Sequence, residues 1–224
     1  MADNKILIGM PCVNTIPVKV VEHLMSLNKP CECYYKFVNG SLVYSARDEI
    51  CSMAMLGGYS HLLFIDSDMY FEPDALVKAL NRNVDVVTGL YFKRRDDHDP
   101  VLYKKIGKRL YNEEGRIIRH GFSEVETDLT RDFFQVEGCG CGFMLISVET
   151  LKKMHKKSIS WFEPLLGLGE DLSFCERLKD IDVPLWCDTT IDLGHYGEYC
   201  YTWKDWNTQK EDDGIKIEWN TSAE

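Results

Sequence analysis

The stretch HLLFIDSDMYF, residues 61–71, decides the fold of this chain. Its four consecutive apolar residues, 62–65, predict a strand of a parallel sheet that is buried on both faces. Asp66 and Asp68 follow at once, so the strand brings two carboxylates to the carboxyl edge of the sheet, where open α/β sheets bind ligands. A turn in which aspartate simply favours the loop conformation would explain the same letters.

Strand and helix patterns alternate on both sides of this stretch. Apolar runs predict strands at residues 5–10, 33–38, 85–92 and 143–146. Helical spacing predicts helices after Pro17, from Ser45 to Gly57, after Pro73, over residues 149–157 and from Glu170. Such alternation indicates an α/β fold with a mostly parallel central sheet flanked by helices.

Three local patterns refine this picture. Ser45 and Asp48 have the spacing of a capping box at the start of a helix. A hairpin is predicted near Gly115 within the polar, mixed residues 93–135, which would supply a small antiparallel portion. Residues 183–187 predict an edge strand because Pro184 cannot donate to a ladder.

Composition narrows the class of protein. The chain has 224 residues, of which 45% are hydrophobic, enough for one good core. A net charge of −10 argues against a whole-surface grip on nucleic acid, although a local basic patch stays open. No apolar run reaches membrane-spanning length and the first residues lack a signal-peptide pattern, so we expect no membrane span and a cytoplasmic location.

Nine cysteines are scattered along the chain. The close pairs, Cys31 with Cys33 and Cys139 with Cys141, have a one-residue gap that suits zinc chelation poorly. We therefore expect reduced and mostly buried thiols.

Asp66, Asp68 and His195 form the first group of residues that could carry chemistry. Carboxylates together with substrate phosphates suit Mg²⁺ or Mn²⁺, and an imidazole ligand favours Mn²⁺. His195 stands between Gly194 and Gly197, which permit close backbone approach. A hydrogen-bonded loop histidine is the equal alternative.

Glu170 and Asp171 form the second group, at a predicted helix start after the glycine-rich residues 167–169. An ionised carboxylate there could take a proton from an attacking hydroxyl. Acids at a helix N-terminus are also common because the helix dipole favours them.

The third group is the loop GCGCG, residues 138–142, whose alternating glycines suggest a bulge or a wall for a ligand. It matches neither a phosphate-binding P-loop nor a dinucleotide fingerprint. Two basic features are also candidate site residues. Arg47 and the run at residues 93–95 could touch a phosphate, although solvated positions would explain both.

In order and context, these pieces resemble the GT-A-fold glycosyltransferases. The resemblance runs through ILIGMP, SARDEICSMAM, DSD, GCGCGFMLI, GEDLSFCERL and LGHYG, and it covers most of residues 5–197. It implies one GT-A-like, Rossmann-like domain over residues 1–204, and the polar composition of residues 205–224 predicts a tail after it. Within it, residues 1–92 would bind the nucleotide and 93–204 would supply the acceptor and catalytic half.

The resemblance also implies the metal site. Asp68 would bind Mn²⁺ or Mg²⁺ directly, and His195 would complete the ligand set. Asp66 would face the ribose or a metal-bound water, and Ser67 would lie against the donor between the two acids.

A nucleotide-diphosphate sugar, above all a UDP-sugar, is the donor that the resemblance implies. Pro11 would border the base, and Arg47 would lie near the base or diphosphate. Gly140 and Gly142 would border the donor sugar and the acceptor.

The implied reaction is hexosyl transfer to an acceptor hydroxyl, with Asp171, and Glu170 beside it, as the base of an inverting enzyme. The acceptor stays open among a glycan, a small molecule, a protein and a modified nucleobase. The sequence does not predict the oligomeric state.

Two other functions remain. A nucleotidyltransferase would carry a Gly-rich, Lys/Arg-bearing loop after its first strand, whereas this chain has Met-Pro-Cys-Val-Asn at residues 10–14. A non-catalytic nucleotide- or glycan-binding module would not need Asp66, Asp68, Asp171 and His195 together.

Overall fold

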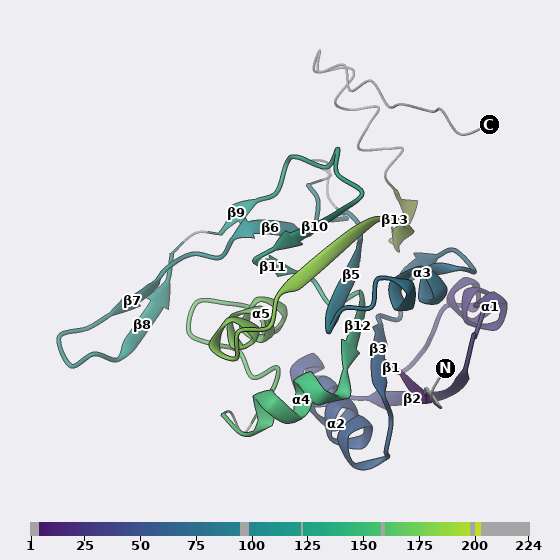
Figure 1. The fold of residues 1–224 in the computed structure, drawn as a ribbon, viewed down its shortest axis with the longest axis horizontal. Helices are drawn as coiled ribbons and strands as arrows, with labels where there is room; N and C mark the ends of the chain where they lie inside the picture. Colours follow the sequence, from purple (N-terminus) through teal and green to yellow (C-terminus); the bar gives the residue numbers. More distant parts are fainter. Residues whose placement is uncertain (1–4, 95–98, 122, 158–159, 198–199, 203–224) are drawn as a thin grey trace.

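A mixed central sheet organises the protein (Figure 1). The structure is a computed structural model that describes residues 5–94, 99–121, 123–157, 160–197 and 200–202. The strand order is β10-β13-β5-β12-β3-β1-β2. Their bounds are β1 (Lys5–Cys12), β2 (Glu32–Asn39), β3 (His61–Ile65), β5 (Val86–Leu90), β10 (Phe133–Val136), β12 (Phe143–Ser147) and β13 (Leu185–Tyr196).

Most of these strands share one direction, as the sequence predicts. β1, β2, β3, β5 and β13 run the same way, because β1 pairs in parallel with β2 and β3, and β13 pairs in parallel with β5. β12 lies antiparallel between β3 and β5, and β10 lies antiparallel to β13. β12 therefore interrupts the parallel order between the two halves of the sheet.

The run at residues 62–65 is buried on both faces of the sheet. Leu62 and Phe64 belong to one hydrophobic cluster, whereas Leu63 and Ile65 belong to the other. This division follows from the alternation of side chains along a strand. All four side chains are 0% exposed, which confirms the fully buried strand that the apolar run predicts.

Five described helices cover the two faces (Figure 1). α2, α4 and α5 contribute to the cluster that contains Phe64, and α1 and α3 contribute to the cluster that contains Ile65. The helices are α1 (Val18–Ser26), α2 (Val43–Leu56), α3 (Ala75–Asn81), α4 (Val148–His155) and α5 (Glu170–Asp180).

The start of α2 differs from the capping-box prediction. The helix begins at Val43, and its N-cap Leu42 makes no side-chain cap. Asp48 instead accepts hydrogen bonds from the backbone N–H groups of Trp161 (3.0 Å) and Phe162 (2.8 Å). The carboxylate thus holds a distant loop rather than its own helix terminus, which spacing along one helix cannot reveal.

The prediction that residues 183–187 form an edge strand is also wrong. β13 is twelve residues long and lies inside the sheet between β10 and β5. Pro184 precedes its first residue, so the missing N–H costs no ladder bond. The far end of β13 pairs with β4 (Met69–Phe71) and β14 (Cys200–Tyr201), which places His195 in a strand rather than a loop.

Smaller antiparallel pieces extend from this body. β6 (Leu102–Lys105) pairs with β9 (Glu124–Val125) and β11 (Gly138–Cys139). β7 (Arg109–Tyr111) and β8 (Ile117–His120) form the predicted hairpin around Gly115, and Figure 1 shows it projecting away from the sheet.

Other expectations meet the structure only in part. No helix in the described ranges is long and apolar enough to cross a membrane. The eight cysteines whose side chains are described are all free. The predicted tail, residues 205–224, lies outside the described residues, and the division at residue 92 stays a prediction.

Candidate functional site

The two acids of the opening stretch lie in a short turn between β3 and β4. The backbone N–H of Asp66 donates to the carbonyl of Gly142 (2.9 Å), and the carbonyl of Asp68 accepts from the N–H of Tyr196 (2.7 Å). The turn is therefore fastened to the glycine loop on one side and to the end of β13 on the other. This brings the two acids, the glycine loop and the end of β13 that carries His195 to one edge of the sheet.

Asp68 contacts His195 and Arg94 through a single oxygen. Its Oδ2 lies 3.4 Å from His195 Nε2 and 3.0 Å from Arg94 Nη1. Burial alone would raise the pKa of Asp68, but the hydrogen bond and charge of His195 and the charge of Arg94 outweigh it, so the pKa is lowered. Asp68 is therefore held as a carboxylate.

The orientation of His195 fits a ligand of a cation. Its Nδ1 lies 3.2 Å from the carbonyl of Phe92, which can only accept, so this contact places a proton on Nδ1. In the neutral ring, Nε2 then presents a lone pair to Asp68. Two acceptors that face each other need a positive charge between them, either a proton on the imidazole or a bound metal ion.

Arg47 lies buried between two carboxylates. Its side chain is 2% exposed, and Nη2 lies 3.0 Å from Asp66 Oδ1 and 3.6 Å from Asp171 Oδ1. Nη1 donates to the carbonyl of Cys141 (3.3 Å). Because these contacts are with the protein itself, the guanidinium ties the turn after β3 to the start of α5.

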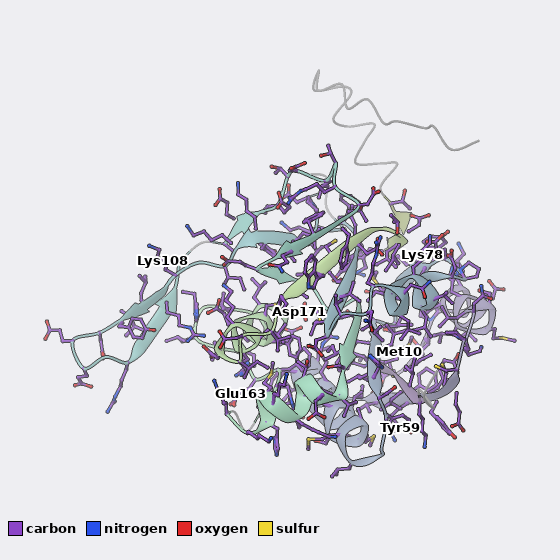
Figure 2. All side chains as sticks on the ribbon, viewed as in Figure 1. Met10, Tyr59, Lys78, Lys108, Glu163 and Asp171 are labelled. Atoms are coloured by element: carbon purple, nitrogen blue, oxygen red, sulfur yellow. The ribbon has the colours of Figure 1, made fainter. Side chains whose placement is uncertain are left out.

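Asp171 occupies the first turn of α5, near the middle of the molecule (Figure 2). Burial raises the pKa of Asp171 to about 6, Arg47 opposes the rise, and the charges of Glu170 and Asp66 add to it. Its Oδ1 is buried without a hydrogen-bond partner in the described structure, while the side chain as a whole is 32% exposed. A carboxylate with this pKa is mostly ionised at neutral pH and is a stronger base than an ordinary aspartate.

The glycine loop encloses the ring of Tyr91. The N–H of Gly142 donates to the Tyr91 hydroxyl (3.0 Å), and a Cβ at Gly142 would lie 2.9 Å from Tyr91 Cζ and 2.8 Å from Met69 Sδ. A Cβ at Gly140 would overlap with the same hydroxyl. Both glycines are buried, so their visible role is to admit Tyr91.

Gly140→Ala is expected to lower the free energy of unfolding by about 1–3 kcal/mol, because the added methyl must displace Tyr91. Urea unfolding measures the change. Gly40→Ala is the matched control, since nothing lies within 4 Å of a Cβ there, and its effect should stay within about 0.5 kcal/mol. Equal stabilities of the two variants would contradict this role of the loop.

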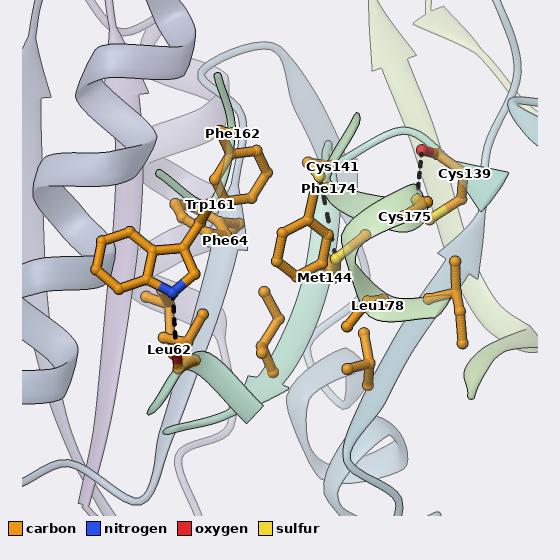
Figure 3. Close-up of a cluster of buried hydrophobic side chains, with 14 of the residues drawn as sticks. Leu62, Phe64, Cys139, Cys141, Met144, Trp161, Phe162, Phe174, Cys175 and Leu178 are labelled. Atoms are coloured by element: carbon orange, nitrogen blue, oxygen red, sulfur yellow. Dashed lines mark hydrogen bonds between the residues drawn. The ribbon is translucent and has the colours of Figure 1, made fainter. Parts of the chain in front are cut away.

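The two cysteines of the loop are part of the core (Figure 3). Cys139 and Cys141 are 0% exposed, and Cys175 of α5 donates to the carbonyl of Cys139 (3.7 Å). Burial raises the pKa of both loop thiols well above the usual range. They therefore stay protonated at neutral pH, which suits packing rather than nucleophilic attack.

A cavity of about 200 Å³ adjoins the acidic turn, and its lining includes Pro11, Gly40, Asp66, Ser67 and Asp68. It is smaller than the 300–1,000 Å³ typical of complete ligand sites, so it could hold only part of a nucleotide sugar. The cavity does place Pro11 and Ser67 beside the two acids, as the sequence predicts for one site.

No protein-family model and no curated protein matches this chain. Among solved structures, A197 from STIV aligns with a TM-score of 0.60 and 19% identity over 86% of this chain and 86% of that chain. The fold is shared. TarS 1-349 from S. aureus aligns with a TM-score of 0.48 and 14% identity over 83% of this chain and 60% of that chain. This TM-score is too low to show a shared fold. The mixed α/β architecture shared with A197 is consistent with a GT-A-like fold.

Of two further residues that shape this site, the sequence analysis missed Tyr91 and left the role of Arg94 open. Tyr91 follows β5 and organises the glycine loop, but within an apolar run it looked like an ordinary strand residue. Arg94 stood in a basic run that solvation could explain, yet it contacts both Asp68 and the carbonyl of Tyr196 (3.0 Å). A basic residue just after a strand that ends at the site edge was the available signal.

The predicted metal ligands are only partly brought together. Asp68 and His195 face each other, whereas Asp66 turns toward Arg47. Within the described ranges, no group of three or more His, Cys, Asp or Glu side chains is arranged to hold a metal ion. Two protein ligands with opposed lone pairs still fit a Mg²⁺ or Mn²⁺ ion that takes its other ligands from phosphates and water.

Proposed function

We propose that this protein is a metal-dependent, inverting glycosyltransferase that moves a sugar from a nucleotide-diphosphate sugar to an acceptor hydroxyl. One observation carries the proposal: the guanidinium of Arg47 joins Asp66 of the acidic turn to Asp171 at the start of α5. A donor held at the turn would therefore place its sugar near a carboxylate with a raised pKa. The fold shared with A197 agrees with the GT-A-like fold that the sequence resemblance implies.

Asp171 would act as the base. It would take the proton of the acceptor hydroxyl as that oxygen bonds to the anomeric carbon, while the bond from this carbon to the diphosphate oxygen breaks. The diphosphate leaves with the electron pair. A pKa of about 6 lets Asp171 be ionised at neutral pH and still accept a proton readily.

Asp68 and His195 would hold Mg²⁺ or Mn²⁺, with the chain supplying Asp68 Oδ2 and His195 Nε2. Such an ion stabilises negative charge on a departing diphosphate. Phe92 orients the imidazole through its carbonyl, so the ring presents Nε2 rather than Nδ1. Asp66, with its carboxylate on Arg47, would face the ribose or a metal-bound water.

Arg47 would act by position and not by contact with the donor. Its side chain is 2% exposed and is occupied by Asp66, Asp171 and the carbonyl of Cys141. The rings of Phe64 and Phe162 lie 5.4 and 5.7 Å from the guanidinium carbon, which leaves it little freedom to move. This revises the expectation that Arg47 reaches the base or diphosphate.

A thermal-shift panel of nucleotide sugars, with and without Mn²⁺, tests donor binding. We expect one donor class to raise the melting temperature in the presence of Mn²⁺, because a ligand that binds only the folded state stabilises it. UDP-sugars are the first to test. A panel without any metal-dependent shift would contradict the proposed donor.

A further inference from the structure

We propose that Arg94 is a built-in counter-cation of Asp68 that competes with the metal ion in the free protein and moves to the diphosphate when the donor binds. This inference rests on the proposed function, whose metal site it deepens. It concerns one oxygen, Asp68 Oδ2, which both Arg94 and His195 contact.

The geometry lets Asp68 Oδ2 pair either with the guanidinium of Arg94 or with a metal ion, but not with both. Arg94 Nη1 lies 3.0 Å from Asp68 Oδ2, the oxygen that also faces His195 Nε2 across 3.4 Å. A divalent ion held by Asp68 and His195 would need the oxygen that now faces the guanidinium. Like charges beside one oxygen of a partly buried carboxylate repel strongly, so Arg94 would withdraw from Asp68 when a metal binds.

The side chain of Arg94 is able to withdraw. It is 45% exposed, whereas His195 is 17% exposed and is oriented by the carbonyl of Phe92. Among the described residues, Arg94 Nη1 also donates to the carbonyl of Tyr196, a neutral acceptor that holds it less firmly than a carboxylate. The imidazole is thus the fixed partner of Asp68 and the guanidinium is the movable one.

A diphosphate offers Arg94 a new partner at the same place. The planar guanidinium matches phosphate oxygens with paired hydrogen bonds. A donor that arrives with the metal brings such oxygens to Asp68, so the charge that opposed metal binding would then favour it. Arg94 would make metal binding depend on the donor.

The first test is a titration of the free protein with Mn²⁺, followed by the electron paramagnetic resonance signal of unbound Mn²⁺. Arg94→Ala should bind Mn²⁺ roughly two- to five-fold more tightly than wild type, the effect of removing one exposed ion pair. Lys93→Ala is the matched control, because it removes a neighbouring positive charge that pairs with Asp99 (3.1 Å) and not with Asp68. Its affinity should stay near wild type.

In the second test, Arg94→Ala is expected to weaken binding instead of strengthening it. Calorimetry at saturating Mn²⁺ measures binding of uridine diphosphate and guanosine diphosphate, and the tighter one serves as the probe. Arg94→Ala should bind this probe roughly tenfold more weakly or worse, because a charge-assisted hydrogen bond is lost. Lys93→Ala should again resemble wild type.

Asp68→Asn in the Arg94→Ala background should remove the gain in Mn²⁺ affinity. Persistence of the gain would place the metal elsewhere and overturn the inference. Equal Mn²⁺ affinities of wild type and Arg94→Ala, or no Mn²⁺ on either, would also overturn it. The Mn²⁺ titration uses no donor and no turnover, so a protein that transfers no sugar can still pass it, and an active transferase can still fail it.

Discussion

Replacing Asp171 with asparagine is expected to reduce sugar transfer by about 10²- to 10⁴-fold, because this is the usual contribution of a general base. Asparagine has nearly the same shape but takes no proton. Binding of the nucleoside diphosphate in Mn²⁺ should survive, since Asp171 touches Arg47 rather than the acidic turn. Steady-state kinetics and calorimetry on the same preparation separate the two effects. Unchanged turnover would show that another group takes the proton.

The pH dependence of sugar transfer is a second test of Asp171 as the base. The pKa of Asp171 lies at about 6, so the base is ionised above this pH and transfer should decline as the pH falls through it. Glu170 raises this pKa through its negative charge, and Glu170→Gln should therefore move the acidic limb to lower pH. A limb that stays in place in Glu170→Gln would contradict the assignment of the limb to Asp171.

Asp68→Asn is expected to weaken nucleoside diphosphate binding in the presence of Mn²⁺ by about 100-fold or more. Loss of a group that only supports a metal ligand already costs about 10- to 100-fold. The amide keeps the shape of the side chain but loses the charge that a divalent cation needs. Calorimetry with Mn²⁺ measures the loss. The same titration in EDTA is the control, and there the variant and wild type should bind alike.

Asp68→Asn and Asp171→Asn should therefore fail for different reasons. The first should lose donor binding that depends on metal, and the second should keep it and lose turnover. Ser67→Ala changes the lining of the same cavity without changing its charge, because Ser67 lies between the two acids and is neutral. Equal losses of binding in the two aspartate variants would contradict the division of roles.

The sequence reveals the parts of the site that depend on neighbours along the chain. The apolar run at residues 62–65 predicts its own strand, and the strand then fixes where Asp66 and Asp68 must lie. The start of α5 at Glu170 is equally local, because glycines precede it and acids suit its first turn. These features need only the periodicity of strands and helices.

Contacts between distant segments account for what the sequence could not reveal. Arg47 is buried because a loop 94 residues away supplies the carbonyl of Cys141 and α5 supplies Asp171. Asp48 lies inside α2, which begins at Val43, and its carboxylate accepts hydrogen bonds from Trp161 and Phe162, more than a hundred residues on. No pattern within one helix distinguishes these residues from solvated ones.

The most direct test of the central claim is the release of nucleoside diphosphate from a panel of nucleotide sugars incubated with the full chain and Mn²⁺. Catalysed release from one donor, lost in Asp171→Asn and in EDTA, is the predicted result. Donor binding without any release would indicate a non-catalytic module. Release of pyrophosphate from a nucleoside triphosphate and a sugar phosphate would indicate a nucleotidyltransferase. Either of these results would contradict the proposed glycosyl transfer.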